Sequence, residues 1–162
     1  MLIGILSDTH DRADAMAAGL KVLRENGAEM FIHCGDVGGQ KIIDLMAGLK
    51  GLFVWGNTDF NQAALSQYAA DLGVDCRGEL AELEVDGKKI AVTHGHDHQI
   101  MSRIRADKSY DYLLHGHTHI ASDTRAGRLR IINPGALHRT SRKSVALLDL
   151  RKDELQFLPV AV

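Results

Sequence analysis

The sequence predicts an α/β fold whose first half alternates strands with helices and whose second half consists largely of paired strands. Three short apolar runs, each followed by a segment with helical spacing, indicate the first half. Three segments of alternating polarity, each with a turn signal in its middle, predict β-hairpins in the second half. A mixed sheet, or two packed sheets with helices outside, fits this pattern better than two separate domains.

Strands and helices follow one another in the first half. The run LIGILS at residues 2–7 is continuously apolar, as expected of a strand buried on both faces of a sheet. Helical spacing follows in Met16, Leu20 and Leu23 of residues 13–26. The same signals predict strands at 29–36 and 51–57 and helices at 40–49 and 62–73. This alternation indicates βαβ units and a parallel sheet.

Hairpins are predicted in the second half. Residues 79–95 alternate on both sides of Asp86-Gly87, a strong hairpin signal. The other two hairpins are predicted at residues 121–135, turning at Ala126-Gly127, and at residues 144–160, turning around Lys152-Asp153. We therefore expect strands to dominate this half.

The length and charge of the chain narrow the classes of function. A chain of 162 residues has the size of one domain, so we expect residues 1–162 to form a single domain. A formal net charge of -2 argues against a broad basic surface for nucleic acid, although the cluster at residues 138–144 could meet phosphates. We expect no nucleic-acid partner, and a homo-oligomer is compatible with the sequence.

The cysteines and the N-terminus indicate a cytoplasmic protein. Cys34 and Cys76 are isolated from each other, which argues against a disulfide framework or a zinc ribbon. No basic residue precedes the first apolar run and Asp8 follows it directly, unlike a signal peptide. No apolar run is long enough to span a bilayer, so we expect no membrane partner.

Polar residues collect at the ends of the apolar runs. Seven of them share this position: Asp8, His10, Asp36, Asn57, His94, His117 and His119. In open α/β sheets the carboxyl ends of the strands form the crevice where ligands bind, so we expect these side chains to converge.

Each motif has an ordinary interpretation when it is taken alone. Asp8 after a strand is often a helix N-cap, and Gly35-Asp36 is usually a turn. Asn57 tolerates a turn, and Asp59 then caps the following helix. A functional interpretation rests on all of the motifs occupying strand ends in one chain.

The chemistry of the set indicates a metal centre. Carboxylate, amide and imidazole ligands suit Mn, Fe, Ni or Zn better than Mg or Ca. Seven candidates are too many for one metal, and two dications about 4 Å apart repel by roughly 16 kcal/mol at an effective dielectric near 20. A carboxylate and a hydroxide between the ions would offset this repulsion, and the hydroxide would be a nucleophile.

The order of the motifs resembles that of the calcineurin-like metallophosphoesterases. The matching segments are DTH at 8–10, GD at 35–36, GN at 56–57, THGH at 93–96, GHTH at 116–119 and INPGAL at 132–137. The resemblance is closest to the small bacterial and archaeal phosphodiesterases, which consist of the catalytic domain alone. It implies a two-sheet mixed β sandwich flanked by helices, in four layers α/β/β/α.

The resemblance also assigns the ligands and the reaction. It implies that Asp8, His10 and His119 hold one metal, that Asn57, His94 and His117 hold the second, and that Asp36 bridges both. His96 would lie near the substrate and act with Asp36 and Asn57 in catalysis. We expect manganese, with iron, nickel or zinc as alternatives. The implied reaction is hydrolysis of a small phosphate ester, a diester in preference to a monoester in view of these relatives, by in-line attack of the metal-bridging hydroxide.

One position departs from the commonest pattern of the family. Many members have a histidine after Gly-Asn that assists the leaving group, and this chain has Thr58 there. A threonine hydroxyl has no useful acid pKa, which leaves the choice between monoester and diester open. His96 or a metal-bound water is then the alternative proton donor.

Other histidines and arginines receive ordinary roles. We expect His33 and His115 to be structural, His98 to lie in a surface loop, and Arg139 and Arg142 to be solvated. Two other functions remain open: a protein-binding scaffold, like the retromer subunit of similar fold, and a nuclease of the same superfamily.

Overall fold

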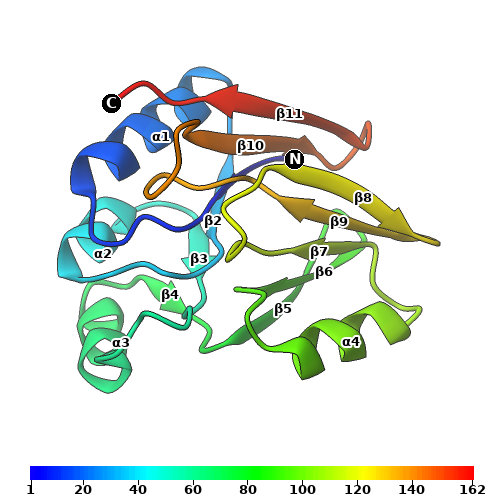
Figure 1. The fold of residues 1–162 in the computed structure, drawn as a ribbon, viewed down its shortest axis with the longest axis horizontal. Coiled ribbons are helices and arrows are strands. Elements are labelled where there is room, and N and C mark those ends of the chain that lie inside the picture. Colours follow the sequence, from blue (N-terminus) through cyan, green and yellow to red (C-terminus); the bar gives the residue numbers. More distant parts are fainter.

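Two β-sheets stacked face to face form the centre of the computed structural model, which describes residues 1–162 (Figure 1). The six-stranded sheet has the order β11-β10-β1-β2-β3-β4, and the five-stranded sheet has the order β5-β6-β7-β9-β8. Helices α1, α2 and α3 lie beside the first sheet, and α4 lies on the far side of the second (Figure 1).

The six-stranded sheet contains the three predicted parallel strands and a fourth, β4, that was not predicted. Its parallel strands are β1 (Leu2–Leu6), β2 (Met30–His33), β3 (Gly51–Phe53) and β4 (Asp75–Cys76). The antiparallel strands are β10 (Ser144–Asp149) and β11 (Glu154–Pro159). The helices are α1 (Ala13–Glu25), α2 (Gln40–Met46) and α3 (Gln62–Asp71). The βαβ units predicted for the first half are therefore confirmed.

The five-stranded sheet combines parallel and antiparallel pairs. Its strands are β5 (Leu80–Val85), β6 (Lys88–Thr93), β7 (Tyr112–Leu114), β8 (Ser122–Ala126) and β9 (Leu129–Asn133). The three inner strands β6, β7 and β9 run parallel, and the edge strands β5 and β8 pair antiparallel with their neighbours. Two sheets of this kind give the sandwich that the resemblance implies.

The three predicted hairpins are present. Asp86 and Gly87 join β5 to β6 with φ values of 50° and 72°, the paired positive values that a two-residue type I′ turn requires. Strand β8 pairs with β9 in a register that places Ala126 opposite Leu129. Strand β10 returns as β11 after a short connection at residues 150–153.

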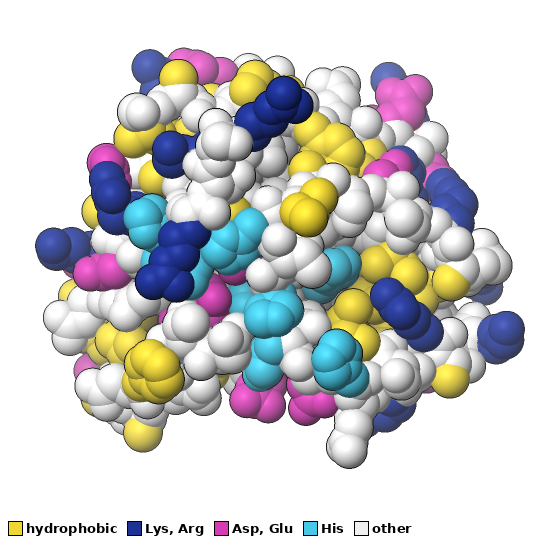
Figure 2. All heavy atoms as spheres, in the orientation of Figure 1, with side chains coloured by type: hydrophobic (Ala, Val, Ile, Leu, Met, Phe, Trp, Pro, Cys, Tyr) yellow, Lys and Arg dark blue, Asp and Glu magenta, His cyan; other side chains and the backbone are white.

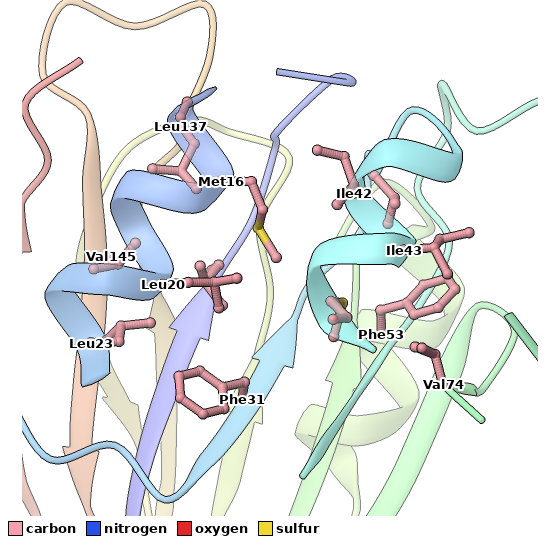
Figure 3. Close-up of a cluster of buried hydrophobic side chains, with 14 of the residues drawn as sticks. Met16, Leu20, Leu23, Phe31, Ile42, Ile43, Phe53, Val74, Leu137 and Val145 are labelled. Atoms are coloured by element: carbon pink, nitrogen blue, oxygen red, sulfur yellow. The ribbon is translucent and has the colours of Figure 1, made fainter. Parts of the chain in front are cut away.

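The first layer of the core lies between the helices and the six-stranded sheet. Met16, Leu20 and Leu23 of α1 point from one face of the helix toward the sheet, where Phe31 lies among them (Figure 3). All four side chains are buried. Burial of each such side chain contributes about 1.5–3 kcal/mol, so the helical spacing in the sequence corresponds to a large stabilisation.

Two further layers complete the sandwich. Side chains such as Ile5 and Ile32 of the first sheet meet Val92 and Leu114 of the second in a separate buried cluster. A third, smaller cluster packs α4 against the outer face of the second sheet. The layers are thus helices, sheet, sheet and helix, as predicted.

Helix α4 (His98–Ala106) is absent from the prediction. Its buried positions are few, chiefly Met101 and Ile104, so the apolar periodicity is short. The side chain of Asp97 accepts hydrogen bonds from the backbone N–H groups of Gln99 and Ile100 and begins the helix. His98 is exposed, as expected, but lies in the helix and not in a loop. None of the four helices is long and apolar enough to cross a membrane.

Candidate metal centre

The predicted ligands lie in loops at the carboxyl ends of parallel strands. Asp8 follows β1, Asp36 follows β2, Asn57 follows β3, His94 follows β6, and His117 and His119 follow β7. Because these strand ends meet along one side of the sandwich, histidine side chains gather on a single face with acidic side chains between and below them (Figure 2).

Asp8, His10 and His119 form one group of potential metal ligands. One ligand atom from each residue lies within 4.8 Å of the other two. The Nε2 atom of His119 is 3.1 Å from Oδ1 of Asp8, and Nε2 of His10 is 4.0 Å from the same oxygen. These are the three residues that the resemblance assigns to the first metal.

Asp8, Asp36 and His94 form a second, overlapping group. Nε2 of His94 lies 3.3 Å from Oδ2 of Asp36 and 3.9 Å from Oδ1 of Asp8. Oδ2 of Asp36 is also 3.5 Å from Nε2 of His10, so this carboxylate reaches members of both groups.

The remaining predicted ligands lie at the border of the second group. The ring of His117 is 5.2 Å from the ring of His94, centroid to centroid. Asn57 is exposed in the loop between Gly56 and Thr58. The backbone N–H of Thr58 donates to Oδ1 of Asp36 at 3.0 Å, which ties this loop to the cluster.

Buried ligand atoms in the cluster lack hydrogen-bond partners. Oδ1 of Asp8, Nε2 of His10 and Nε2 of His94 are all buried, and none has a partner in the protein. An unsatisfied buried polar group costs about 1–3 kcal/mol, so three such atoms facing one another need a ligand. Two carboxylates with imidazole nitrogens fit a divalent transition metal.

Neighbouring groups keep Asp36 ionised. Burial would raise the pKa of this carboxyl, but the imidazole of His94 beside it, together with hydrogen bonds from Thr58, holds the pKa well below its ordinary value. Burial in turn opposes protonation of His94, yet Asp36 and Asp8 raise its pKa overall. The Asp36 carboxylate is therefore ionised, as a cation ligand must be.

Hydrogen bonds to the other ring nitrogen orient two of the imidazoles. Nδ1 of His94 lies 2.8 Å from the backbone oxygen of Cys34, and Nδ1 of His119 lies 3.4 Å from that of Arg139. Each ring thus turns Nε2 toward the carboxylates. Carbonyl groups behind metal-binding histidines commonly fix the ring in this way.

The loops that carry the cluster have unusual backbone conformations. Nine non-glycine residues of the chain have positive φ. Seven of these lie in the loops around the cluster: Asp8, His10, Asp11, Asp36, His117, His119 and Arg139. Such conformations cost about 1–3 kcal/mol each and persist where the surroundings fix them, typically at functional sites.

Two glycines allow these loops to approach one another. A Cβ atom on Gly56 would lie 2.1 Å from Oδ1 of Asp36. On Gly116 it would lie 1.9 Å from Oγ of Ser7 and 2.6 Å from Oδ2 of Asp8. Any side chain at either position would displace a carboxylate of the cluster.

Asp59 does not cap the following helix, contrary to its ordinary interpretation. Its buried carboxylate accepts the backbone N–H groups of Val37 at 3.2 Å, Gly38 at 2.9 Å and Gly56 at 2.8 Å. Burial raises its pKa, and the three hydrogen bonds oppose this rise. Asp59 thus joins the loop of Asp36 to the loop of Asn57, a role that its sequence context did not indicate.

Asn133 holds the loop of His117 and His119. Its buried side chain donates from Nδ2 to the backbone oxygen of Gly116 at 2.8 Å and to Oγ1 of Thr118 at 3.0 Å. The segment INPGAL, in which it lies, is one of the motifs that carry the resemblance.

His96 lies among the imidazoles of the cluster. Its ring is 5.5 Å from that of His94 and 6.2 Å from that of His117. Its Nδ1 atom is buried without a hydrogen-bond partner. Thr58 lies beside another ring of the cluster, with Oγ1 3.5 Å from Nδ1 of His10.

His33 and His115 are buried behind the cluster. Burial, together with the nearby His94, lowers the pKa of His33 to about 3, so this ring is neutral. The backbone N–H of Gly35 points at its Nδ1, so its Nε2–H donates to Oγ1 of Thr9 at 3.0 Å. The buried ring of His115 has its Nδ1 3.1 Å from the backbone oxygen of Gly116. Both positions agree with the structural roles expected for them.

His138 is a neighbour of the metal cluster, although the sequence indicated it only as part of the basic segment at residues 138–144. Its ring lies 5.8 Å from that of His10. It follows β9, which runs parallel to β7, so it occupies the same kind of strand end as the predicted ligands. The position of His138 after an apolar strand was visible in the sequence. Strand β9 was predicted only as an arm of a hairpin, however, and the sequence did not show that it runs beside β7.

Known proteins resemble this chain over nearly its whole length. The family model of the calcineurin-like phosphoesterase superfamily domain matches residues 1–153. The phosphodiesterase MJ0936 of Methanocaldococcus jannaschii is 28% identical over 159 residues, which cover 95% of this chain and 96% of that protein. The solved structure of an archaeal phosphodiesterase superposes with a TM-score of 0.90 at 26% identity, covering 99% of this chain and 100% of that one.

The same fold also occurs in Vps29, whose name does not describe a phosphoesterase. Vps29 of Entamoeba histolytica, solved with zinc, gives a TM-score of 0.68 at 21% identity, over 98% of this chain and 91% of that one. This likeness extends to the fold alone. The match over residues 1–153 decides the family: the chain belongs to the calcineurin-like phosphoesterase superfamily.

Proposed function

We propose that this protein is a dinuclear metal-dependent phosphodiesterase acting on small phosphate esters, with residues 1–162 as one catalytic domain. The observation that carries the proposal is the meeting of two overlapping groups of ligands whose buried atoms have no protein partner. A scaffold would have no need for unpartnered carboxylate and imidazole atoms at the centre of strained loops.

The ligand assignment divides the cluster between two metals. Asp8, His10 and His119 would hold the first ion, Asn57, His94 and His117 the second, and Asp36 would bridge them, with Asp8 close enough to touch both sites. Manganese is the proposed ion, and iron, nickel or zinc would suit the same donors. Bound ions would supply Lewis acidity at the phosphoryl oxygens and a hydroxide for in-line attack on phosphorus.

The chain itself contributes position and a proton donor. Asp59 and Asn133 fix the loops that carry the ligands, so that the ligand atoms are in place before substrate arrives. His96, whose ring lies beside those of His94 and His117, would contact the substrate and donate a proton to the leaving group. No imidazole occupies position 58, so the site has less acid assistance for a poor leaving group.

Preference for diesters follows from the same position. Thr58 offers a hydroxyl near His10 where an acid would assist departure of a monoester alcohol. A diester carries one fewer negative charge than a monoester and approaches a carboxylate-rich site with less repulsion. The similar phosphodiesterase of Methanocaldococcus jannaschii points the same way. The two free cysteines agree with a reduced, cytoplasmic setting.

Hydrolysis of a chromogenic diester tests the proposal. Protein freed of metal with EDTA is reloaded with manganese, iron, nickel or zinc and assayed with bis(p-nitrophenyl) phosphate and with p-nitrophenyl phosphate. We expect metal-dependent hydrolysis that favours the diester. Inertness with every ion, while the folded protein still captures a protein partner, would support a scaffold instead. Activity confined to long DNA or RNA would support a nuclease.

A further inference from the structure

A polar hollow lies beside the metal cluster, where the loop after β9 meets the start of α1. It has a volume of about 360 Å³. Its polar wall consists of Arg12, Asp14, His138, Arg139, Thr140 and Lys143. Lys and Arg side chains border the histidines on this face of the molecule (Figure 2).

The hollow carries an excess of positive charge. Arg12 pairs with Asp14, with 2.9 Å between Nη2 and Oδ2, so these two charges offset each other. Arg139 and Lys143 line the same hollow, and neither forms an ion pair within 4.0 Å with a side-chain carboxylate or with Val162, the last residue of the sequence, which also lines it. Two cations therefore face the hollow without compensation, and guanidinium and ammonium groups bind phosphate well.

The hollow and the cluster share a wall. The ring of His138 lies in the hollow and is 5.8 Å from the ring of His10. The backbone oxygen of Arg139 lies 3.4 Å from Nδ1 of His119, and Arg139 has a positive φ of 53°. The cationic loop is thus fixed against two predicted metal ligands, so an anion in the hollow would lie close to a phosphate at the cluster.

We propose that this hollow is an anion subsite that binds a second phosphate group on the substrate, near the phosphate that is cleaved. The inference rests on the proposed function and narrows the substrate class to phosphodiesters that carry a further phosphate on one arm. Two uncompensated cations suit one such group. They are too few for a long nucleic acid, which requires several phosphate contacts on a broad basic surface.

A matched pair of substrates tests the subsite. The p-nitrophenyl ester of thymidine 5′-phosphate and the same ester with an added 3′-phosphate have the same leaving group and the same diester. Charge-assisted contacts to one phosphate should raise kcat/KM for the 3′-phosphorylated ester by about tenfold or more. Equal kcat/KM for the two esters would overturn the subsite while leaving the phosphodiesterase intact. Hydrolysis of neither ester would count against the proposed function itself.

Variants in the loop locate the effect. In the double variant R139Q/K143Q, kcat/KM for the 3′-phosphorylated ester should be within about twofold of kcat/KM for the ester without it, because both uncompensated charges are removed. The control variant R142Q removes a charge from the same loop, but Arg142 lines a different hollow beside Phe157. R142Q should keep the preference. An equal loss in R142Q would show a general effect of charge and would overturn the subsite.

Binding without catalysis gives a second readout. Thymidine 3′,5′-bisphosphate and thymidine 5′-phosphate are titrated into the metal-free protein by calorimetry. We expect the bisphosphate to bind at least fivefold more tightly, and R139Q/K143Q to abolish this difference. Equal affinities in the unmodified protein would contradict the subsite. If kcat/KM keeps rising with the length of an oligonucleotide substrate, the hollow is part of a nucleic-acid groove and the single-phosphate subsite is overturned.

Discussion

Nε2 of His94 lies 3.3 Å from Oδ2 of Asp36, although the two residues follow strands of different sheets. The contact joins the two halves of the sandwich at the metal cluster. It keeps the Asp36 carboxylate ionised and places it between the two groups of ligands. The contribution of each half to this cluster can be tested separately.

Replacement of Asp36 tests the bridging assignment. Asp36→Asn keeps the size of the side chain and removes the negative charge that would offset repulsion between two cations. We expect metal content to fall by at least one ion per chain, and hydrolysis of bis(p-nitrophenyl) phosphate to fall by a factor of about 100 or more. Elemental analysis of the dialysed protein measures the metal. Two ions per chain in the variant would refute the bridge.

Replacement of Thr58 tests substrate preference. Thr58→His places an imidazole next to Asp36 and His10, where it can donate a proton to a leaving group. We expect the ratio of monoester to diester hydrolysis to rise by about tenfold, the lower part of the range for general acid catalysis. Thr58→Asn, which adds a polar group without an acid, is the matched control. The same ratio in all three proteins would remove position 58 from specificity.

Removal of Asp59 should loosen the loops without touching a ligand. Asp59→Ala leaves three backbone N–H groups without their acceptor, those of Val37 and Gly56 in buried positions, so we expect the free energy of unfolding to fall by about 3 kcal/mol. Asp71→Ala, at an exposed position of α3, should change it by less than about 0.5 kcal/mol. Urea denaturation of the metal-free proteins measures both. Similar stabilities for the two variants would show that Asp59 does not hold the loops.

The acid stability of the protein should depend on Asp153. Burial would raise the pKa of this carboxyl, but hydrogen bonds from Arg125, Tyr112 and Arg130 lower it from 3.8 to about 2. A carboxyl whose pKa is lower in the folded state stabilises the fold above the unfolded pKa, and this stabilisation is lost as the pH falls through the folded value. We expect the free energy of unfolding to fall between about pH 4 and pH 2.

Asp153→Asn removes the titrating group. Its unfolding free energy should be lower than that of the unmodified protein at pH 6 and should fall less between pH 4 and pH 2. Urea denaturation at several pH values measures the difference. Parallel curves for the two proteins would assign the acid sensitivity to other carboxylates.

The sequence alone determined most of the elements and which polar residues end the strands. Helical spacing in α1 and the Asp86-Gly87 turn are local patterns, and local patterns can be read without a structure. The position of Asp8 and Asp36 after apolar runs was enough to predict that they meet, because strand ends of one sheet share an edge. The approach of His94, which follows a strand of the other sheet, also depends on the packing of the two sheets. The short periodicity of α4 was too weak to predict that helix.

Only the tertiary structure decided which other residues join the site. Asp59 accepts N–H groups from two loops, and His138 reaches His10 because β9 runs beside β7. These contacts depend on strand order and loop conformation, which arise from the packing of the two sheets. A linear pattern records which residues end a strand, whereas the distance between two strand ends is set by the sheets that bring them together.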